Sequence, residues 1–201
     1  MDNHKPVLIV IAGPNGSGKT SITKEILHHK WMENAAYINP DEVAQHMFGN
    51  WNDKDAVMQA VNYCEELREQ CLKEQKSLIF ETVLSIPDKV DYIFRAKKAG
   101  FFIRLFFVCT TYPTINAARI AQRVLQGGHD VPISKVINRY YKSIALCNVA
   151  SYVADRTYVY DNSVENESAK LLFRLNEGHI AKTYTENIPE WALPIYERRP
   201  V

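Results

Sequence analysis

The feature that most constrains the fold is an apolar β-branched run followed at once by a glycine-rich segment. Residues 7–12 read VLIVIA, and residues 13–20 read GPNGSGKT. A run that is apolar at every position predicts a strand covered on both faces, as in a parallel sheet. The glycines let successive backbone N–H groups turn inward and form a nest for an anion. Residues 21–30 have a helical pattern, so the positive end of a helix would face the same anion.

The glycine-rich segment matches the pattern G-x-x-x-x-G-K-[ST], and four fixed positions coincide by chance in under roughly 1% of chains of this length. In this pattern Lys19 reaches the β- and γ-phosphates of a nucleotide, and the hydroxyl of Thr20 ligates Mg²⁺. The sequence therefore predicts a nucleotide site made of Gly13, Pro14, Asn15, Gly16, Ser17, Gly18, Lys19 and Thr20.

Strand and helix patterns alternate along the rest of the chain. Further strands are predicted over residues 35–38, 78–82, 101–109 and 157–160, and helices from residue 40 and over 55–73, 87–99, 113–126 and 133–154. This alternation predicts an α/β three-layer sandwich, with a five-stranded parallel sheet and helices on both faces. Together with the phosphate-binding segment it leads us to expect a P-loop NTPase-type fold with the strand order 2-3-1-4-5.

The end of the chain has a different pattern. Residues 171–184 predict a small hairpin around Asn176-Glu177-Gly178, and the proline-containing residues 188–201 are expected to run over the surface. With 201 residues the chain is expected to form a single domain, with a core over 1–162 and the hairpin and tail over 163–201.

Composition excludes several classes of protein. Lys and Arg number 24 against 23 for Asp and Glu, a formal charge of +1, so the chain lacks the overall positive charge of a nucleic-acid binder, although a local patch stays open. Because no apolar run approaches about 20 residues, no membrane span is predicted. The four cysteines form no CxxC pair and are expected to be buried free thiols, which suits the reducing cytoplasm.

Acidic residues follow two of the predicted strands, where an open parallel sheet binds its ligands. Asp41 comes after the second strand and could accept the proton of a substrate hydroxyl, or be an acid in the first turn of a helix that interacts with its dipole. Glu81, followed by Thr82, ends the third strand. It could bind a substrate hydroxyl or a Mg²⁺-bound water, or serve as a cap or ion-pair partner.

Arginines mark a candidate lid over the nucleotide. Arg119 and Arg123 are four residues apart and share a helix face close to Gly127-Gly128. Two arginines on one face beside a glycine hinge could close on the phosphates and stabilise a transferring phosphoryl group, and the alternative is a solvated helix face. Arg139 follows in the next helix.

An ordered set of motifs over residues 6–162 resembles the zeta-toxin group of P-loop kinases, as a short member: GPNGSGKT, INPDEVA, ETVLS, AARIAQRVLQGGHDVP, INRYYKS and VYDNS. The resemblance implies ATP-dependent phosphoryl transfer to a sugar hydroxyl of UDP-N-acetylglucosamine. It implies a catalytic set of Lys19, Asp41, Arg119 and Arg123, and substrate-binding residues Asp41, Glu81, Thr82 and Arg139. ATP and Mg²⁺ would be the cofactors, and a protein antitoxin is the partner that the resemblance implies.

The residues and the resemblance together predict a cytoplasmic kinase that phosphorylates a small molecule. Two alternatives stay open. One is a nucleotide-dependent switch or regulatory ATPase, which would have the same phosphate loop without an acceptor site. The other is a nucleoside or polynucleotide 5′-kinase, whose polynucleotide form the near-zero net charge disfavours.

Overall fold

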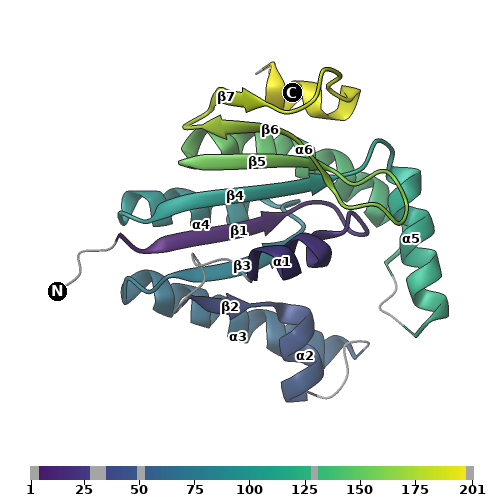
Figure 1. The fold of residues 1–201 in the computed structure, drawn as a ribbon. Coiled ribbons are helices and arrows are strands. Elements are labelled where there is room, and N and C mark those ends of the chain that lie inside the picture. The colour runs from purple at the N-terminus through teal and green to yellow at the C-terminus, as the bar shows by residue number, and fades with distance from the viewer. Residues whose placement is uncertain (1–4, 28–34, 49–52, 128–130, 198–201) are drawn as a thin grey trace.

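A computed structural model describes residues 5–27, 35–48, 53–127 and 131–197. Its centre is one seven-stranded sheet in the order β2-β3-β1-β4-β5-β6-β7 (Figure 1). The strands are β1 (Val7–Ala12), β2 (Ala36–Ile38), β3 (Leu78–Thr82), β4 (Phe102–Cys109), β5 (Arg156–Asp161), β6 (Lys170–Asn176) and β7 (His179–Thr183). β1 to β5 pair in parallel, whereas β6 and β7 are antiparallel to their neighbours.

Helices connect the parallel strands. They are α1 (Lys19–Leu27), α2 (Pro40–Phe48), α3 (Lys54–Lys73), α4 (Pro87–Lys98), α5 (Pro113–Leu125), α6 (Ile133–Val153) and α7 (Leu193–Tyr196), with a 3₁₀ turn, η2, over Glu190–Ala192. In Figure 1, α3, α4 and α6 lie behind the sheet and α1 lies in front of it. Proline opens both α4 and α5, where its missing N–H costs no helical hydrogen bond.

The two faces of the sheet carry separate cores, which explains why β1 is apolar at every position. Leu8 and Val10 belong to a large cluster with residues of α3, α4 and α6. Ile9 and Ile11 belong to a second cluster that includes Ile22 of α1. Successive side chains of a strand point to opposite faces, so a strand covered on both sides needs apolar residues throughout.

The fold class and the strand order 2-3-1-4-5 are confirmed. The C-terminal hairpin is not separate from the sheet, because β6 pairs with β5 and extends it by two strands. The expectation that residues 188–201 run over the surface is wrong for the described part of that segment. Ala192 and Ile195 are fully buried, and Trp191 is 7% exposed, with its Nε1 donating to Asp161 Oδ2 at 2.9 Å.

The strand register brings the chain's polar turns together at one edge of the sheet. Ala12 at the end of β1 pairs with Thr82 at the end of β3, and the N–H of Gly13 donates to the carbonyl of Thr82 at 3.2 Å. β1 and β3 are neighbours whose connections run in opposite directions, from β1 to β2 on one side and from β3 to β4 on the other. Ligands of open α/β sheets bind at such a switch point. Within the described ranges, no helix is long and apolar enough to cross a membrane.

Candidate active site

The loop between β1 and α1 has a backbone that only glycine can adopt at two of its turns. Gly16 has φ +76° and Gly18 has φ +92°. A Cβ at Gly16 would lie 2.6 Å from the carbonyl oxygen of Asn116, and one at Gly18 would lie 2.1 Å from Nδ2 of Asn162. Both the dihedral angles and the lack of space therefore require glycine, and the loop can keep its N–H groups turned toward one point.

Two polar side chains of the loop, Lys19 and Thr20, line the cavity beside it. The Nζ of Lys19 donates to the carbonyls of Gly13 at 2.9 Å and Pro14 at 3.0 Å, so its ammonium lies across the loop. The hydroxyl of Thr20 is on an exposed residue that lines the adjoining cavity. The described residues contain no cluster of three or more His, Cys, Asp or Glu that could hold a metal. A Mg²⁺ ion here would therefore depend on Thr20, phosphate oxygens and water, which is its usual environment beside a nucleotide.

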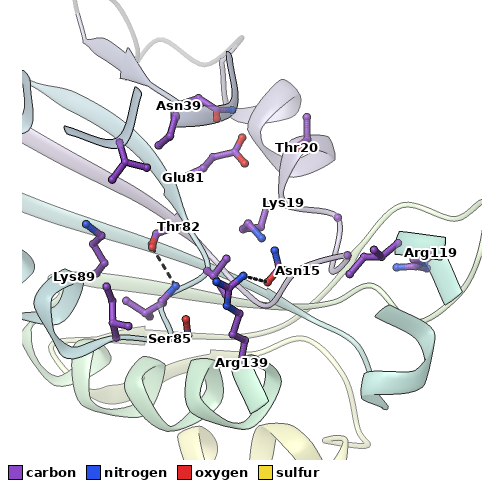
Figure 2. A pocket seen from close by; sticks show the side chains of 18 of the residues that line it. Asn15, Lys19, Thr20, Asn39, Glu81, Thr82, Ser85, Lys89, Arg119 and Arg139 are labelled. Carbon is purple, nitrogen blue, oxygen red and sulfur yellow. Dashed lines mark hydrogen bonds between the residues drawn. The ribbon is translucent and has the colours of Figure 1, made fainter. Parts of the chain in front are cut away.

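Three side chains from outside the loop hold it in place. The amide of Asn116, a fully buried residue of α5, donates to the carbonyl of Asn15 at 2.7 Å. Arg139 of α6 donates from Nη1 to Asn15 Oδ1 at 3.1 Å, as Figure 2 shows. The amide of Asn162, directly after β5, donates to the carbonyl of Ser17 at 2.8 Å. The loop conformation thus depends on contacts from three elements distant in sequence.

The two predicted lid arginines lie on α5 and both line the cavity beside the loop. Arg119 donates from Nη1 to the carbonyl of Asn162 at 2.8 Å, and its Nη2 lies 3.5 Å from the carbonyl of Val164. These contacts place the Arg119 guanidinium between this cavity and a second one of about 510 Å³. Arg123 is one turn further along the helix.

Glu81, at the end of β3, is held by two hydroxyl groups. Thr23 of α1 donates to its Oε1 at 2.5 Å, and the hydroxyl of Tyr37 of β2 donates to the same oxygen at 3.0 Å. Asn39 in turn donates from Nδ2 to the Tyr37 hydroxyl at 2.9 Å. Burial, and then the charge of Glu81, raises the pKa of Tyr37, so this hydroxyl keeps its proton and remains a donor. The network fixes the Glu81 carboxylate at the cavity wall.

Besides Glu81, the residues predicted to bind the acceptor are Thr82, Asp41 and Arg139, and Arg139 lines the cavity while it bonds Asn15 of the loop. The hydroxyl of Thr82 accepts from the N–H of Leu84 at 3.1 Å, and Leu84 has a left-handed backbone with φ +54°. Thr82 therefore stabilises the sharp turn after β3 as well as lining the cavity. Asp41 is in the first turn of α2, next to Pro40, which lines the cavity. The side chain of Asp41 lies outside the described part of the structure.

One cavity of about 550 Å³ connects the loop to the residues around Glu81. Figure 2 shows Lys19 and Glu81 between Lys89 on one side and Arg119 on the other. The basic residues that line this cavity are Lys19, Arg68, Lys89, Arg119, Arg123 and Arg139. Among the described lining residues Glu81 is the sole carboxylate. This excess of positive charge suits anionic ligands, and the single acid suits a ligand hydroxyl that donates a hydrogen bond to it.

Sequence reasoning missed the residues that support the site. Asn116, Thr23 and Tyr37 carry no motif, and each acts by donating to a group brought near by the fold. A buried asparagine in a helix gives no signal in a single sequence. Asn162 does have a signal in the sequence, because it directly follows a strand, at the end of the sheet where ligands bind.

Comparisons with solved structures agree with this architecture. The chain is similar to a structure from the PezAT chromosomal toxin–antitoxin system of Streptococcus pneumoniae, with 15% identity and a TM-score of 0.63 over 99% of this chain and 81% of that one. It is also similar to AvrRxo1-ORF1:-ORF2 crystallised with ATP, with 17% identity and a TM-score of 0.65 over 90% of this chain and 61% of that one. A putative kinase from Chloroflexus aurantiacus matches with 18% identity and a TM-score of 0.51, over 70% of this chain and 79% of that one.

At these identities the structural matches establish the fold alone, and the chain spans only about three fifths of the AvrRxo1 chain. No curated protein matches the sequence closely enough to count as a relative. The family comparison is more extensive, because the model described as Zeta toxin matches residues 1–169. That range contains the phosphate loop, Glu81 with its hydroxyl donors, and the arginines of α5 and α6. The chain therefore belongs to the zeta toxin family of P-loop kinases.

Proposed function

We propose that the protein is an ATP-dependent kinase that transfers the γ-phosphoryl group to a hydroxyl of a small molecule. The observation that carries the proposal is that one cavity, of about 550 Å³, is lined both by the phosphate loop with Lys19 and by Glu81. A phosphate site and an acid that face one space can hold a donor and an acceptor in line, which is most of what phosphoryl transfer requires. Membership of the zeta toxin family supports the same class of reaction.

At the nucleotide end, the loop N–H groups and Lys19 would hold the β- and γ-phosphates. Thr20 would ligate Mg²⁺, which supplies positive charge against the phosphoryl oxygens. Arg119 and Arg123 would bind the γ-phosphate and stabilise the charge that spreads over it during transfer. The nucleoside would occupy the second cavity of about 510 Å³, which Gly18, Arg119 and Asn162 help to line.

At the acceptor end, Glu81 would orient the hydroxyl and Asp41 would act as general base. Both described donors to Glu81 bind Oε1, which leaves Oε2 for the acceptor. The acceptor oxygen forms a bond to the γ-phosphorus while the bond from that phosphorus to the β–γ bridging oxygen breaks. The hydroxyl proton passes to the Asp41 carboxylate. A positioned base of this kind contributes about 10²–10⁴-fold in rate.

Transfer of label from ATP tests the reaction. The purified protein is incubated with Mg²⁺, γ-labelled ATP and a panel of nucleotide sugars, nucleosides and polyols, and one compound is expected to gain the label. Asp41→Asn should lower that rate by about a thousandfold. Asp88→Asn is the matched control, since Asp88 is an exposed first-turn acid of α4 that does not line the cavity. If the protein hydrolyses ATP but no compound stimulates the hydrolysis, it would instead be a regulatory ATPase. If Asp41→Asn transfers the label at the full rate, Asp41 is not the general base.

The family supports a finer proposal for the acceptor and for the biological setting. The acceptor would be a nucleotide sugar such as UDP-N-acetylglucosamine, phosphorylated in the cytoplasm, and a protein antitoxin would bind the enzyme. The similarity to a structure from a chromosomal toxin–antitoxin system supports the partner. Induced expression of the wild-type chain should then arrest growth of a bacterial host, while Lys19→Ala should not. Equal growth of the two strains would contradict a toxic role and leave the kinase reaction to be judged by the transfer assay.

A further inference from the structure

The face of the sheet that carries α1 is covered only in part. In Figure 1, α1 lies in front of β1 and β3, and no helix of the described chain lies in front of β5, β6 or β7. The opposite face is packed against residues of α3, α4, α6 and α7 along most of its width. The neighbouring strands β4 to β7 therefore have one face that no described helix covers.

A row of four cations crosses this face, one from each strand. They are Arg104 on β4, Arg156 on β5, Arg174 on β6 and Lys182 on β7, and we call them the basic row. Phe106 and Tyr158 lie on this face, because both pack in the cluster that includes Ile22 of α1. The arginines of β4 and β5 lie two positions before these rings, so they point the same way. The arginine of β6 is directly opposite Tyr158, and the lysine of β7 is directly opposite that arginine.

The register sets these cations against one another. Arg104 is directly opposite Arg156, and Arg174 is directly opposite Lys182. Like charges at directly opposite positions of two strands are destabilising, because their Cβ atoms are only about 5 Å apart. Burial, and to a lesser degree the charge of Arg156, lowers the pKa of Arg104. The row therefore costs the folded chain stability, and none of its four residues lines either cavity of the candidate active site.

The carboxylates of the same strands and turns are engaged elsewhere or lie apart from the row. Asp155, which precedes β5 and attracts Arg104, pairs with Lys97 at 2.7 Å and accepts from a backbone N–H at 2.8 Å. Both oxygens of Asp161 accept hydrogen bonds from outside the row. Glu177, in the turn after β6, and the two glutamates of the loop after β5 form no ion pair within the described residues.

The row has few internal partners of its own. Arg156 donates from Nη1 to Asn176 Oδ1 at 3.0 Å, and the Nζ of Lys182 lies 4.8 Å from the ring centre of Tyr184. The Nε of Arg174 is buried, and it has no hydrogen-bond partner within the described part of the chain. Across those same residues none of these three cations forms an ion pair. Unsatisfied donors and facing like charges are costly unless an anion binds to them.

We propose that the basic row binds single-stranded nucleic acid. Phosphates of the strand would pair with the cations, three of which are arginines, whose planar forks bond phosphate oxygens in pairs. Aromatic rings lie among the cations and could stack with bases. The guanidinium carbon of Arg104 lies 5.0 Å from the ring centre of Phe102, and Tyr184 is 39% exposed. RNA-binding modules with an open sheet face use arginines and aromatic rings in this way.

The net charge of the chain does not oppose this proposal. With 24 basic and 23 acidic residues the chain as a whole has a charge of only +1. The field that a strand of phosphates meets depends on which charges share one face, and here the fold gathers four cations from residues 104 to 182.

An acidic protein is the competing occupant, and the composition of the face disfavours it. The centres of protein–protein interfaces are depleted in charged residues and contain an exposed apolar anchor. Here the two middle strands contribute Arg156 and Arg174, and Phe106 is only 3% exposed. The exposed aliphatic side chain of β7, Ile180, is opposite the core residue Leu175 and so belongs to the other face. Binding through charge therefore fits this face better than binding through an apolar centre.

Fluorescence anisotropy with a labelled oligouridylate of about 15 nucleotides tests the site. The phosphate loop is first saturated with Mg²⁺ and a non-hydrolysable ATP analogue. The wild type should bind with a logarithmic salt slope of about −3, since each phosphate contact of a single strand contributes about −0.7. The double variant Arg174→Gln/Lys182→Gln should bind about tenfold more weakly, with about half that slope. The control Lys98→Gln/Lys142→Gln removes the same charge from exposed positions of α4 and α6, behind the sheet, and should bind as the wild type does.

Two further variants separate nucleic acid from other polyanions and binding from a structural role. Tyr184→Leu should weaken oligouridylate binding by about tenfold through loss of a stacking surface, and leave binding of inorganic polyphosphate unchanged. Lys182→Gln alone should raise the melting temperature slightly, because it removes one of two facing cations. A lower melting temperature with unchanged oligouridylate binding would show that the row is structural, and would overturn the inference.

Lys19→Ala distinguishes the row from the active site. It should bind oligouridylate as the wild type does, because the row lies outside the phosphate loop. Loss of binding in Lys19→Ala would place the strand in the active site and overturn the inference. The inference is also overturned if the wild type binds no oligouridylate, if the double variant binds it with unchanged affinity, or if polyglutamate of equal charge competes with it on equal terms. Label transfer to a small molecule would stand in each of these cases, so the proposed function is judged separately.

Discussion

The two ends of the cavity are built in different ways. At the nucleotide end one continuous segment, residues 13–20, supplies the backbone nest and Lys19, and the rest of the protein braces it. At the acceptor end each side chain comes from a different element: Thr23 from α1, Tyr37 from β2, Glu81 from β3 and Lys89 from α4. A ligand common to many enzymes can be bound by a local motif. A ligand particular to one family needs side chains that only the assembled fold brings together.

The largest expected effect tests the nucleotide end. Lys19→Ala removes the ammonium that lies across the loop, and the transfer rate should fall by about a thousandfold because the phosphoryl charge loses a fixed counter-ion. Lys24→Ala, at an exposed position on the same helix, is the control and should keep full activity. The measurement is kcat for label transfer, and a loss below tenfold in Lys19→Ala would contradict the role of the loop.

Glu81→Gln tests the acceptor end in the same way. The amide keeps the shape but loses the negative charge that both hydroxyl donors bind, so transfer should fall by about a hundredfold, within the range expected for a positioned acid or base. The affinity for ATP should not change, because Glu81 acts on the other substrate. Tyr37→Phe, which removes one of the two donors to Glu81, should show a smaller loss of the same kind. An ATP affinity that falls together with kcat in Glu81→Gln would show that the two ends are not separate.

A moderate effect on the KM for ATP is expected from the side chains that hydrogen-bond to the phosphate loop from other elements. Asn162→Ala removes the amide that donates to the Ser17 carbonyl at 2.8 Å. The KM for ATP should rise by about tenfold, since an unsatisfied buried partner costs about 1–3 kcal/mol. The KM for the acceptor should stay the same. Asn187→Ala, at an exposed position near the C-terminus, serves as the control, and a rise in both KM values would mean that Asn162 supports the whole cavity.

The smallest effect is expected outside both ends. Trp191→Phe keeps an aromatic ring in the buried tail but removes the Nε1 donor to Asp161. The free energy of unfolding, measured by denaturant titration, should fall by about 1 kcal/mol, the usual net value of one hydrogen bond. The kinetic constants should not change. Altered ATP binding in this variant would link the tail to the site through the end of β5.

Much of the fold could be predicted because its signals are local. The apolar run of β1, the prolines that open α4 and α5, and the glycine after α4 each mark a boundary through the dihedral angles or hydrogen bonds of that segment. The antiparallel addition of β6 to β5 and the burial of Trp191 depend on what lies next to these segments in space. Their own residues do not specify that neighbour, so the sequence pattern predicts a tail on the surface where the structure buries Trp191, Ala192 and Ile195.

The phosphate loop and the alternation of strands and helices can be predicted from the residues alone, because glycine geometry and hydrophobic periodicity are properties of each segment. The contacts of Glu81 with Thr23 and Tyr37, and the ion pairs of Arg68 and Lys89 with Glu65, depend instead on how the chain folds. Most of these groups are far apart in the chain, and their interaction depends on distances of a few ångströms. Such distances arise only when the sheet brings the separate segments together.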